Sequence, residues 1–448
     1  MNSLYEPIVR RIESALRYAD TTRCLRLGED LLSQVGATFR EMFGEGQTAI
    51  LVADQNTLDA AGTEILSRLR SEGLTPLEEP FVFIEPNLHT EISQCNRLKE
   101  RFSATKAIPI AVGSGTINDL VKLAAYESGR KYMVVATAAS MDGYTAYGAA
   151  VEVNGFKKTM FCDAPAAVLV DMDVICKAPQ PLSAAGYADL LAKIPAGADW
   201  ILADLVGAEP INSIAFDLVQ DHLRNWIANP DGVAKNEKAP LLNLMEGLLT
   251  SGVAMQYAKT SRTASGAEHL FSHLWDNEGH THHGEIPYHG FKVGIGSIAS
   301  ESLYENVLKL GTNDFLESKK SVLANRRSWE QTEHLIRNSF IGEELVERVI
   351  AESRDKYVSD DEILRRLDVI VESWPEMVPR LQKQLLGPQT IYHMLQTSGA
   401  PAEPEKIGIE RKRLRKSFDL AQLIRSRYNI LDFTLETGMW NHCVDPIF

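Results

Sequence analysis

Six of the eleven histidines lie in one short stretch, from His269 to His289, inside SGAEHLFSHLWDNEGHTHHGEIPYHGFKVGIG (residues 265–296). Histidine is the commonest metal ligand in proteins and the side chain whose ordinary pKa lies nearest neutrality. A cluster of this kind is compatible with a metal site, with a proton relay, or with a polar loop that happens to be rich in one residue.

The spacing of three of these histidines favours a metal site. His269 and His273 are four residues apart in a helical pattern, so their side chains face the same way. His289 opens the next helical stretch and can approach from a neighbouring helix. Asp189, in AGYADLLAK (residues 185–193), is an acid among small and apolar residues, which is costly to bury unless a cation satisfies it.

Two imidazoles and one carboxylate with a position left open form a standard catalytic metal arrangement. From spacing alone, two ordinary helix histidines and a surface acid remain the alternative. The middle histidines, His280, His282 and His283, are predicted to lie in an exposed loop and outside the site.

A glycine turn follows an apolar run in IAVGSGTINDLVKLAA (residues 110–125). Glycines let the backbone approach a ligand closely, and a helix N-terminus offers free N–H groups to a pyrophosphate. The alternative is a tight strand-to-helix turn without a ligand, since the third glycine of the usual dinucleotide fingerprint is missing. A second polar turn, ATAASMDGY (residues 136–144), follows the next apolar run, and the pair predicts a crevice at the ends of adjacent strands.

These residues must be positioned by an α/β segment and a helical one. Short β-branched runs alternate with helical patterns over the first 180 residues, which predicts βαβ units and a mostly parallel sheet. The predicted strands are 49–54, 81–84, 108–112, 133–136 and 167–170, and the predicted helices between them include 57–72 and 91–102. The Asn154-Gly155 pair within residues 151–161 predicts a hairpin.

After Pro181 the patterns are helical, for example over 240–261, 290–310, 329–340 and 417–429. We therefore expect an α/β nucleotide-binding domain over residues 1–180 and a helical metal- and substrate-binding domain over 181–448. The N-terminus is expected to form an amphipathic helix, with Ile8, Ile12, Ala15 and Leu16 on one stripe.

Composition excludes several classes of protein. The 448 residues carry a net charge of -14, which argues against broad binding of nucleic-acid phosphates. The basic run of residues 408–418 is interpreted as a solvated helix face. Five scattered cysteines without a CxxC pair suggest neither a zinc knuckle nor a disulfide framework. We expect no membrane span, no signal peptide and a cytoplasmic location.

Five segments resemble, in the same order, the sn-glycerol-1-phosphate dehydrogenases. They are GSGTI (residues 113–117), the turn of residues 137–143, GYADLLAK, SRTASGAEHLFSH and HGFKVGIG, and SRTASGAEHLFSH is the most specific. This family belongs to the superfamily of glycerol dehydrogenase and iron-containing alcohol dehydrogenase, which includes dehydroquinate synthase. The resemblance covers roughly residues 25 to 440. It implies a Rossmann-like N-terminal domain followed by an all-α C-terminal domain.

The resemblance also implies roles for single residues. The family's metal ligands fall on Asp189, His269 and His289, with His289 preferred to His283 because HGFKVGIG matches in full. His273 and Asp142 match positions that contact the substrate.

The cofactor segments of the family match Gly113, Ser114, Gly115, Thr116, Ile117, Thr137 and Ser140. One further cofactor position is serine in the family and Ala146 here, which removes a hydroxyl. Asp54 ends the first strong strand, where a carboxylate accepts hydrogen bonds from the ribose and repels the 2′-phosphate of NADP. NAD(H) is therefore the preferred cofactor, with NADP(H) possible.

The implied reaction is the reversible reduction of dihydroxyacetone phosphate to sn-glycerol 1-phosphate. One divalent metal ion (zinc, nickel or iron) acts as Lewis acid, and His273 is a candidate to supply the proton. Lys193, Arg262 and Lys292 are candidates to bind the phosphate, and a homo-oligomer is expected. The alternatives are a dehydrogenase of another polyol or sugar phosphate, a dehydroquinate synthase-type lyase, and a protein in which the metal is only structural.

Overall fold

The computed structural model describes residues 4–71, 77–153 and 155–448, and the chain divides into two compact units. The first unit comprises residues 1–190 and 217–261, and the second comprises 191–216 and 262–448. The chain therefore passes between the units three times. The helical segment 217–261 belongs with the sheet by its contacts, although its sequence pattern resembles that of the helical half.

The first unit contains a six-stranded parallel sheet in the order β1-β8-β5-β4-β2-β3. Its strands are β1 (Cys24–Gly28), β2 (Ala49–Asp54), β3 (Phe81–Phe83), β4 (Ile108–Gly113), β5 (Met133–Ala136) and β8 (Ala167–Asp171). The central strands are buried on both faces, which is why they read as continuous apolar runs. The parallel sheet predicted from the sequence is confirmed.

Edge strand β1 was not predicted. The strand, with the sequence CLRLG, is mostly half-buried, and among the described strands it pairs only with β8. A short edge strand of this kind presents no apolar run, so periodicity alone does not reveal it.

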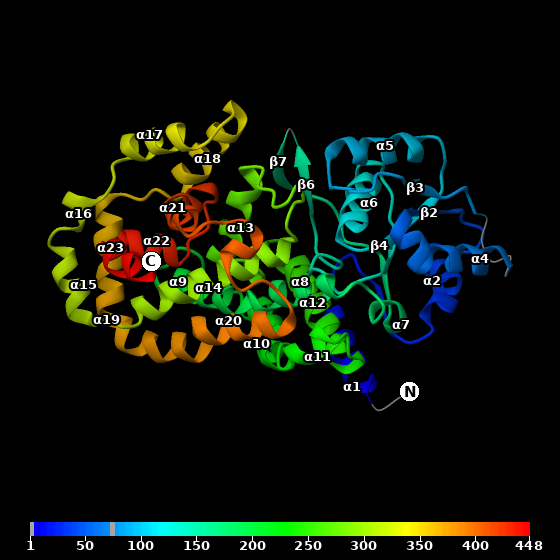
Figure 1. The fold of residues 1–448 in the computed structure, drawn as a ribbon, viewed down its shortest axis with the longest axis horizontal. Coiled ribbons are helices and arrows are strands. Elements are labelled where there is room, and N and C mark those ends of the chain that lie inside the picture. Colours follow the sequence, from blue (N-terminus) through cyan, green and yellow to red (C-terminus); the bar gives the residue numbers. More distant parts are fainter. Residues whose placement is uncertain (1–3, 72–76, 154) are drawn as a thin grey trace. The chain divides into compact units, whose positions relative to one another are not determined.

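Helices cover both sides of the sheet (Figure 1). Helices α2 (Val35–Phe43) and α4 (Thr63–Ser71) share a hydrophobic core with alternate residues of the strands, including Leu51, Val112 and Leu169. Helix α6 (Gly115–Glu127) packs against α5 (Ile92–Ser103) and strand β4. The predicted helix over 57–72 is irregular at its start, with a π turn from Leu58 to Gly62, and its last residue lies outside the described residues.

The strand order reverses between the neighbouring strands β2 and β4. Strand β2 is followed by β3 on one side, whereas β4 is followed by β5 on the other. In open α/β sheets, ligands bind at the carboxyl ends of the strands at such a switch point. Asp54 ends β2 and Gly113 ends β4, so the predicted ribose and pyrophosphate residues flank this point.

The remainder of the first unit includes a hairpin and helices. Strands β6 (Ala149–Val153) and β7 (Phe156–Met160) are antiparallel, which confirms the predicted hairpin, although Asn154 lies outside the described residues. The N-terminal helix α1 (Glu6–Leu16) is confirmed, and it packs against α12 (Lys238–Ala258). Helix α8 (Gln180–Leu191) ends at the boundary between the units.

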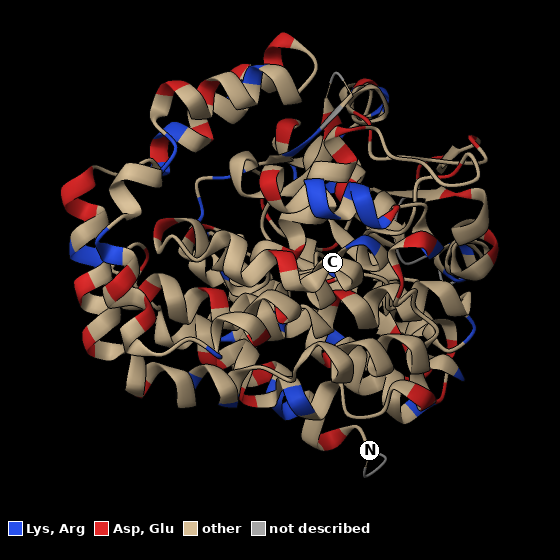
Figure 2. Ribbon diagram, turned by 60° about the vertical axis from the view of Figure 1, so that its left-hand side comes forward, with Lys and Arg blue, Asp and Glu red and all other residues tan. Residues whose placement is uncertain are grey.

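The second unit is helical. Helix α13 (Ala267–Asn277) packs against α14 (His289–Val307), α9 (Lys193–Leu205) and α21 (Arg411–Ala421). The predicted helix over 329–340 is α17 (Trp329–Ser339). The basic run is carried by α21, visible as consecutive blue residues above the C-terminus in Figure 2. Arg413 and Arg415 form ion pairs with Glu278 and Asp419.

The predicted helix over 417–429 is wrong. Helix α21 ends at Ala421, and Arg425 is extended with φ -146°. A new helix, α22 (Ile430–Glu436), begins where the side chain of Asn429 accepts a hydrogen bond from the Leu431 amide. The capping preference of asparagine therefore outweighs the continuous helical pattern.

None of the helices within the described residues combines the length and the apolar character that a membrane crossing demands.

Candidate active site

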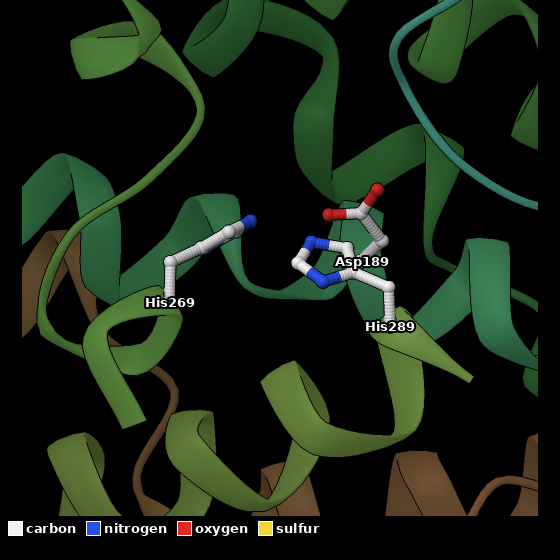
Figure 3. Close-up of side chains that lie close together, drawn as sticks. All are labelled: Asp189, His269 and His289. Atoms are coloured by element: carbon white, nitrogen blue, oxygen red, sulfur yellow. The ribbon is translucent and has the colours of Figure 1, made fainter. Parts of the chain in front are cut away.

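Asp189, His269 and His289 lie close together in the structure. One potential ligand atom of each lies within 4.8 Å of those of the other two (Figure 3). Asp189 and His269 are buried, and His289 is half-buried. Two imidazole nitrogens and a carboxylate oxygen at this separation suit a divalent transition metal.

The two histidines are positioned by the packing of α13 on α14. His269 lies in the first turn of α13, and His289 is the first residue of α14. Gly296 lets these helices approach, because a Cβ there would lie 2.2 Å from the backbone oxygen of Glu268. A larger residue at position 296 would push α14 away from α13.

A hydrogen-bond partner holds each histidine ring through its Nδ1 atom. His269 Nδ1 lies 2.9 Å from Oε1 of the fully buried Glu268, and His289 Nδ1 lies 3.3 Å from the hydroxyl of Ser272. Both partners are on α13. Sequence analysis missed Glu268 and Ser272, although Glu268 stands next to His269 in the motif that carries the resemblance.

Asp189 and Asp142 are brought together by the second polar turn. The Asp142 amide donates a hydrogen bond to Asp189 Oδ2 at 3.2 Å, and Asp142 Oδ2 accepts one from Ser251 at 3.0 Å. Gly186 lies one turn before Asp189 on α8, and a Cβ there would lie 2.0 Å from the backbone oxygen of Ala139. The glycine therefore allows α8 to lie directly against the turn.

A buried lysine holds the far end of the same turn. Lys122 donates hydrogen bonds to the carbonyls of Gly143, Ala146 and Gly148 at 2.8–3.0 Å. The near end is tied to the glycine turn, because the Thr137 amide donates to the carbonyl of Gly113. Nothing in the sequence marks Lys122, since its role depends on carbonyl groups more than twenty residues away.

The glycine turn begins at the end of β4 and leads into α6. A Cβ at Gly113 would lie 2.5 Å from Cβ of Ile117, so only glycine fits there. Ile117 is fully buried, which means that its side chain shapes the turn instead of facing a ligand. Ser114, Gly115 and Thr116 are half-buried at the N-terminus of α6, where backbone N–H groups suit a pyrophosphate.

Asp54 is partly exposed at the end of β2 and caps the short helix α3 (Gln55–Thr57). Its Oδ1 accepts a hydrogen bond from the Thr57 amide at 2.8 Å, and the Thr57 hydroxyl accepts one from the Asp54 amide at 3.1 Å. The residue predicted to bind the ribose therefore also fixes the local backbone.

His273 lies beside the two candidate ligands. Its ring centroid is 6.2 Å from that of His269 and 6.0 Å from that of His289. Burial lowers the pKa of His273 well below its ordinary value, and the charges of Arg425 and of the two neighbouring histidines lower it further. The ring is therefore neutral at physiological pH.

The three basic side chains predicted to bind the substrate phosphate are buried, and two of them form ion pairs with acidic residues. Arg262 forms an ion pair with Glu209, and Lys292 forms one with Asp276. Lys193 is fully buried at the start of α9.

The middle histidines are not in the group of possible metal ligands found among the described residues. The exposed loop predicted for them is wrong for His280, which is buried. His280 donates through Nε2 to the carbonyl of Ile407 and accepts at Nδ1 from Arg413. His283 has a left-handed backbone and its ring contacts that of His282.

Comparison with known proteins shows the family to which this chain belongs. A family model described as "Iron-containing alcohol dehydrogenase" matches residues 26–179. The glycerol-1-phosphate dehydrogenase [NAD(P)+] of Geobacillus thermodenitrificans is 27% identical over 411 residues, which cover 90% of each chain. That of Bacillus subtilis is 33% identical over 62% of this chain and 71% of its own length. The chain belongs to the glycerol-1-phosphate dehydrogenase family.

The fold agrees with this membership. The NADH-dependent butanol dehydrogenase A of Thermotoga maritima matches 94% of this chain and 96% of its own with a TM-score of 0.56, at 14% sequence identity. Like the sheet and helices described above, this match supports an iron-containing alcohol dehydrogenase fold. It shows the fold alone.

Proposed function

We propose that the protein catalyses the reversible, NAD(P)-dependent and divalent-metal-dependent reduction of dihydroxyacetone phosphate to sn-glycerol 1-phosphate. The observation that carries the proposal is the group of Asp189, His269 and His289 in a chain whose curated relatives are named glycerol-1-phosphate dehydrogenases.

Asp189, His269 and His289 would hold the metal, because their donor atoms match a catalytic site with three protein ligands. When bound, the metal acts as a Lewis acid on the substrate carbonyl, and the nicotinamide supplies the hydride. The chain orients these groups: Glu268 and Ser272 hold the imidazoles, and the Asp142 amide holds the carboxylate.

His273 and Asp142 are the proposed substrate-contacting residues. Since His273 is neutral, it is suited to accept the hydroxyl proton when glycerol 1-phosphate is oxidised. In the reductive direction the same path runs in reverse: the ring takes up a proton from solvent and passes it to the substrate oxygen, which returns His273 to its neutral form. Asp142, whose Oδ2 accepts a hydrogen bond from Ser251, would accept another from a substrate hydroxyl.

For the cofactor, we propose that Ser114, Gly115 and Thr116 bind the pyrophosphate while Thr137 and Ser140 line the nicotinamide side. Asp54 at the switch point favours NAD(H) over NADP(H). A cytoplasmic homo-oligomer that acts on a small phosphorylated substrate completes the proposal.

The test is NADH oxidation at 340 nm with dihydroxyacetone phosphate. Protein stripped with a chelator would be reloaded separately with zinc, nickel, iron or cobalt. We expect turnover that depends on the metal and is lost in His269→Ala. His334→Ala is the matched control, because His334 is exposed on α17, outside the triad.

Absence of turnover with every metal would contradict the proposed substrate. A panel of polyols and sugar phosphates would then test the dehydrogenase alternative. Turnover of a dehydroquinate synthase substrate without net consumption of NADH would instead identify a lyase.

A further inference from the structure

We propose that Glu268 and Ser272 are the positioning residues of the metal site, which fix both imidazoles so that their Nε2 atoms face the metal. The inference rests on the metal site of the proposed function and extends that site to the residues that hold its ligands. Both act through a histidine, so neither is itself expected to touch metal or substrate.

The first step of the argument is the geometry of the rings. Each Nδ1 atom already has an oxygen partner on α13, Glu268 for His269 and Ser272 for His289. A neutral imidazole that donates through Nδ1 carries its lone pair on Nε2. The carboxylate of Glu268 can only accept, so it selects the tautomer of His269 that binds a metal through Nε2. The hydroxyl of Ser272 can accept from the same tautomer of His289, and its contact fixes the orientation of that ring.

The second step is that one short helix holds both rings. Glu268 and Ser272 are four residues apart on α13, so their side chains lie on the same face of the helix. Gly296 keeps α14, which carries His289, close enough to α13 for the contact with Ser272.

The third step is the unfavourable surroundings of Glu268. Its side chain is fully buried, and within the described ranges its Oε2 has no hydrogen-bond partner. A Cβ on Gly266 would lie 2.9 Å from this oxygen and 2.3 Å from Oδ2 of Asp199, so two buried carboxylates face the same small space. Arg262 acts on Asp199 and Arg427 acts on Glu268, but Oε2 of Glu268 still lacks a hydrogen bond, which is costly for a buried carboxylate. A dication on His269 would compensate this cost.

These steps predict opposite effects of Glu268→Gln on two measurements. Glutamine still accepts the hydrogen bond of the ring but carries no charge. The affinity of stripped protein for Zn²⁺, measured by competition with a chromophoric chelator, should fall by about tenfold. The thermal midpoint of the metal-free protein should stay equal or rise, because one buried charge is removed.

Two further variants complete the series. Glu268→Ala also removes the hydrogen bond, so its Zn²⁺ affinity should fall by about 10–100-fold. Ser272→Ala should give a smaller loss, since its contact is longer. Glu278→Gln is the matched control: Glu278 directly follows the same helix and forms an ion pair with Arg413, and the variant should bind Zn²⁺ as the wild type does.

Wild-type Zn²⁺ affinity in Glu268→Gln and Ser272→Ala would overturn the inference. A fall in the thermal midpoint of metal-free Glu268→Gln that accounts for its weaker Zn²⁺ binding would also overturn it, because the role would then be structural. Failure of the wild type to bind Zn²⁺, or binding that survives in His269→Ala, would instead overturn the metal site of the proposed function.

Discussion

Asp54 combines a structural and a proposed recognition role in one carboxylate, and the two can be separated. Asn in place of Asp54 keeps the side-chain oxygen that caps α3 but removes the charge. We expect Asp54→Asn to raise the ratio of kcat/KM for NADPH to that for NADH by at least about fivefold. Two like charges about 4 Å apart repel by about 1 kcal/mol even in water.

Steady-state kinetics with both cofactors measures this ratio. Asp59→Asn is the control, because Asp59 is exposed in the turn that follows and bonds only to Gln55 among the contacts observed. An unchanged cofactor ratio in Asp54→Asn would count against recognition of the ribose by Asp54.

Site residues could be predicted where the residue type is unusual for its place in the sequence. The spacing of His269 from His273, the position of His289 at the start of the next helical stretch, and a lone acid among apolar residues indicated a metal site. The structure brings Asp189, His269 and His289 together. Glu268 and Lys122 were missed because their roles follow from burial and from partners in space. Ile117 matched a cofactor segment, yet its side chain is buried against Gly113.

At the scale of elements, the approach of α8 to the second polar turn depends on Gly186. We expect Gly186→Ala to lower the free energy of unfolding by about 1–3 kcal/mol, because its Cβ would meet the backbone of Ala139. The variant should also lose activity, since the turn carries Asp142 against Asp189.

Thermal unfolding and kcat/KM for dihydroxyacetone phosphate check both effects. Gly28→Ala is the control, because a Cβ at Gly28 meets only the side chain of Leu31, at an ordinary distance of 3.7 Å. Wild-type stability in Gly186→Ala would show that the close contact is not maintained in solution.

His280, in the segment that joins α13 to α14, should make the free energy of unfolding depend on pH. Burial lowers the pKa of His280 below its ordinary value. Between that lowered value and about 6.5, the unfolded chain binds more protons than the folded one, so the stability that neutral His280 contributes is lost as the pH falls. At pH 7.5, His280→Leu should lower the free energy of unfolding by about 1–3 kcal/mol, because the Ile407 carbonyl and Arg413 lose a partner.

The difference between wild type and His280→Leu should therefore shrink at pH 5.5, which denaturation at the two pH values measures. His393→Leu provides the comparison, since His393 is exposed on α20 (Pro388–Ser398) and bonds only to Gln389 among the hydrogen bonds observed. A difference that stays constant with pH would contradict the pKa direction.

Helices and strands could be predicted from hydrophobic periodicity where one face of the element, or the whole element, is buried. The central strands and α1, α12, α14 and α17 follow their patterns. Strand β1 does not follow such a pattern, because it lies at the edge of the sheet. The break after Ala421 does not follow one either, because the Asn429 side chain caps the next helix. Hydrophobic patterns record which face is buried, whereas these two features depend on neighbours in space.

At the scale of the whole molecule, the sequence predicted two parts but placed the division at residue 180. The first unit also includes residues 217–261, whose Glu246 and Gln256 bond to Arg11 and Thr22. A fragment of residues 1–180 should therefore lack cooperative unfolding and bind no NADH. Calorimetry and fluorescence titration test this. Cooperative unfolding with NADH binding would instead support a domain boundary near residue 180.

Helical periodicity does not reveal which unit a helix joins, since α12 and α14 have similar sequence character. Helix α12 contacts α1, far away in sequence, and only such pairings assign it to the unit that contains the sheet.

The discontinuity of the first unit also sets an order of events during synthesis. Its last segment leaves the ribosome only after residues 191–216, which belong to the second unit. At about 5–20 residues per second, roughly 4–14 s separate the emergence of residue 190 from that of residue 261. Throughout this interval Asp189 has been made but neither histidine of the triad has, so the nascent chain cannot assemble the three-ligand metal site. Metal loading of that site must therefore follow synthesis of His289, in the second unit.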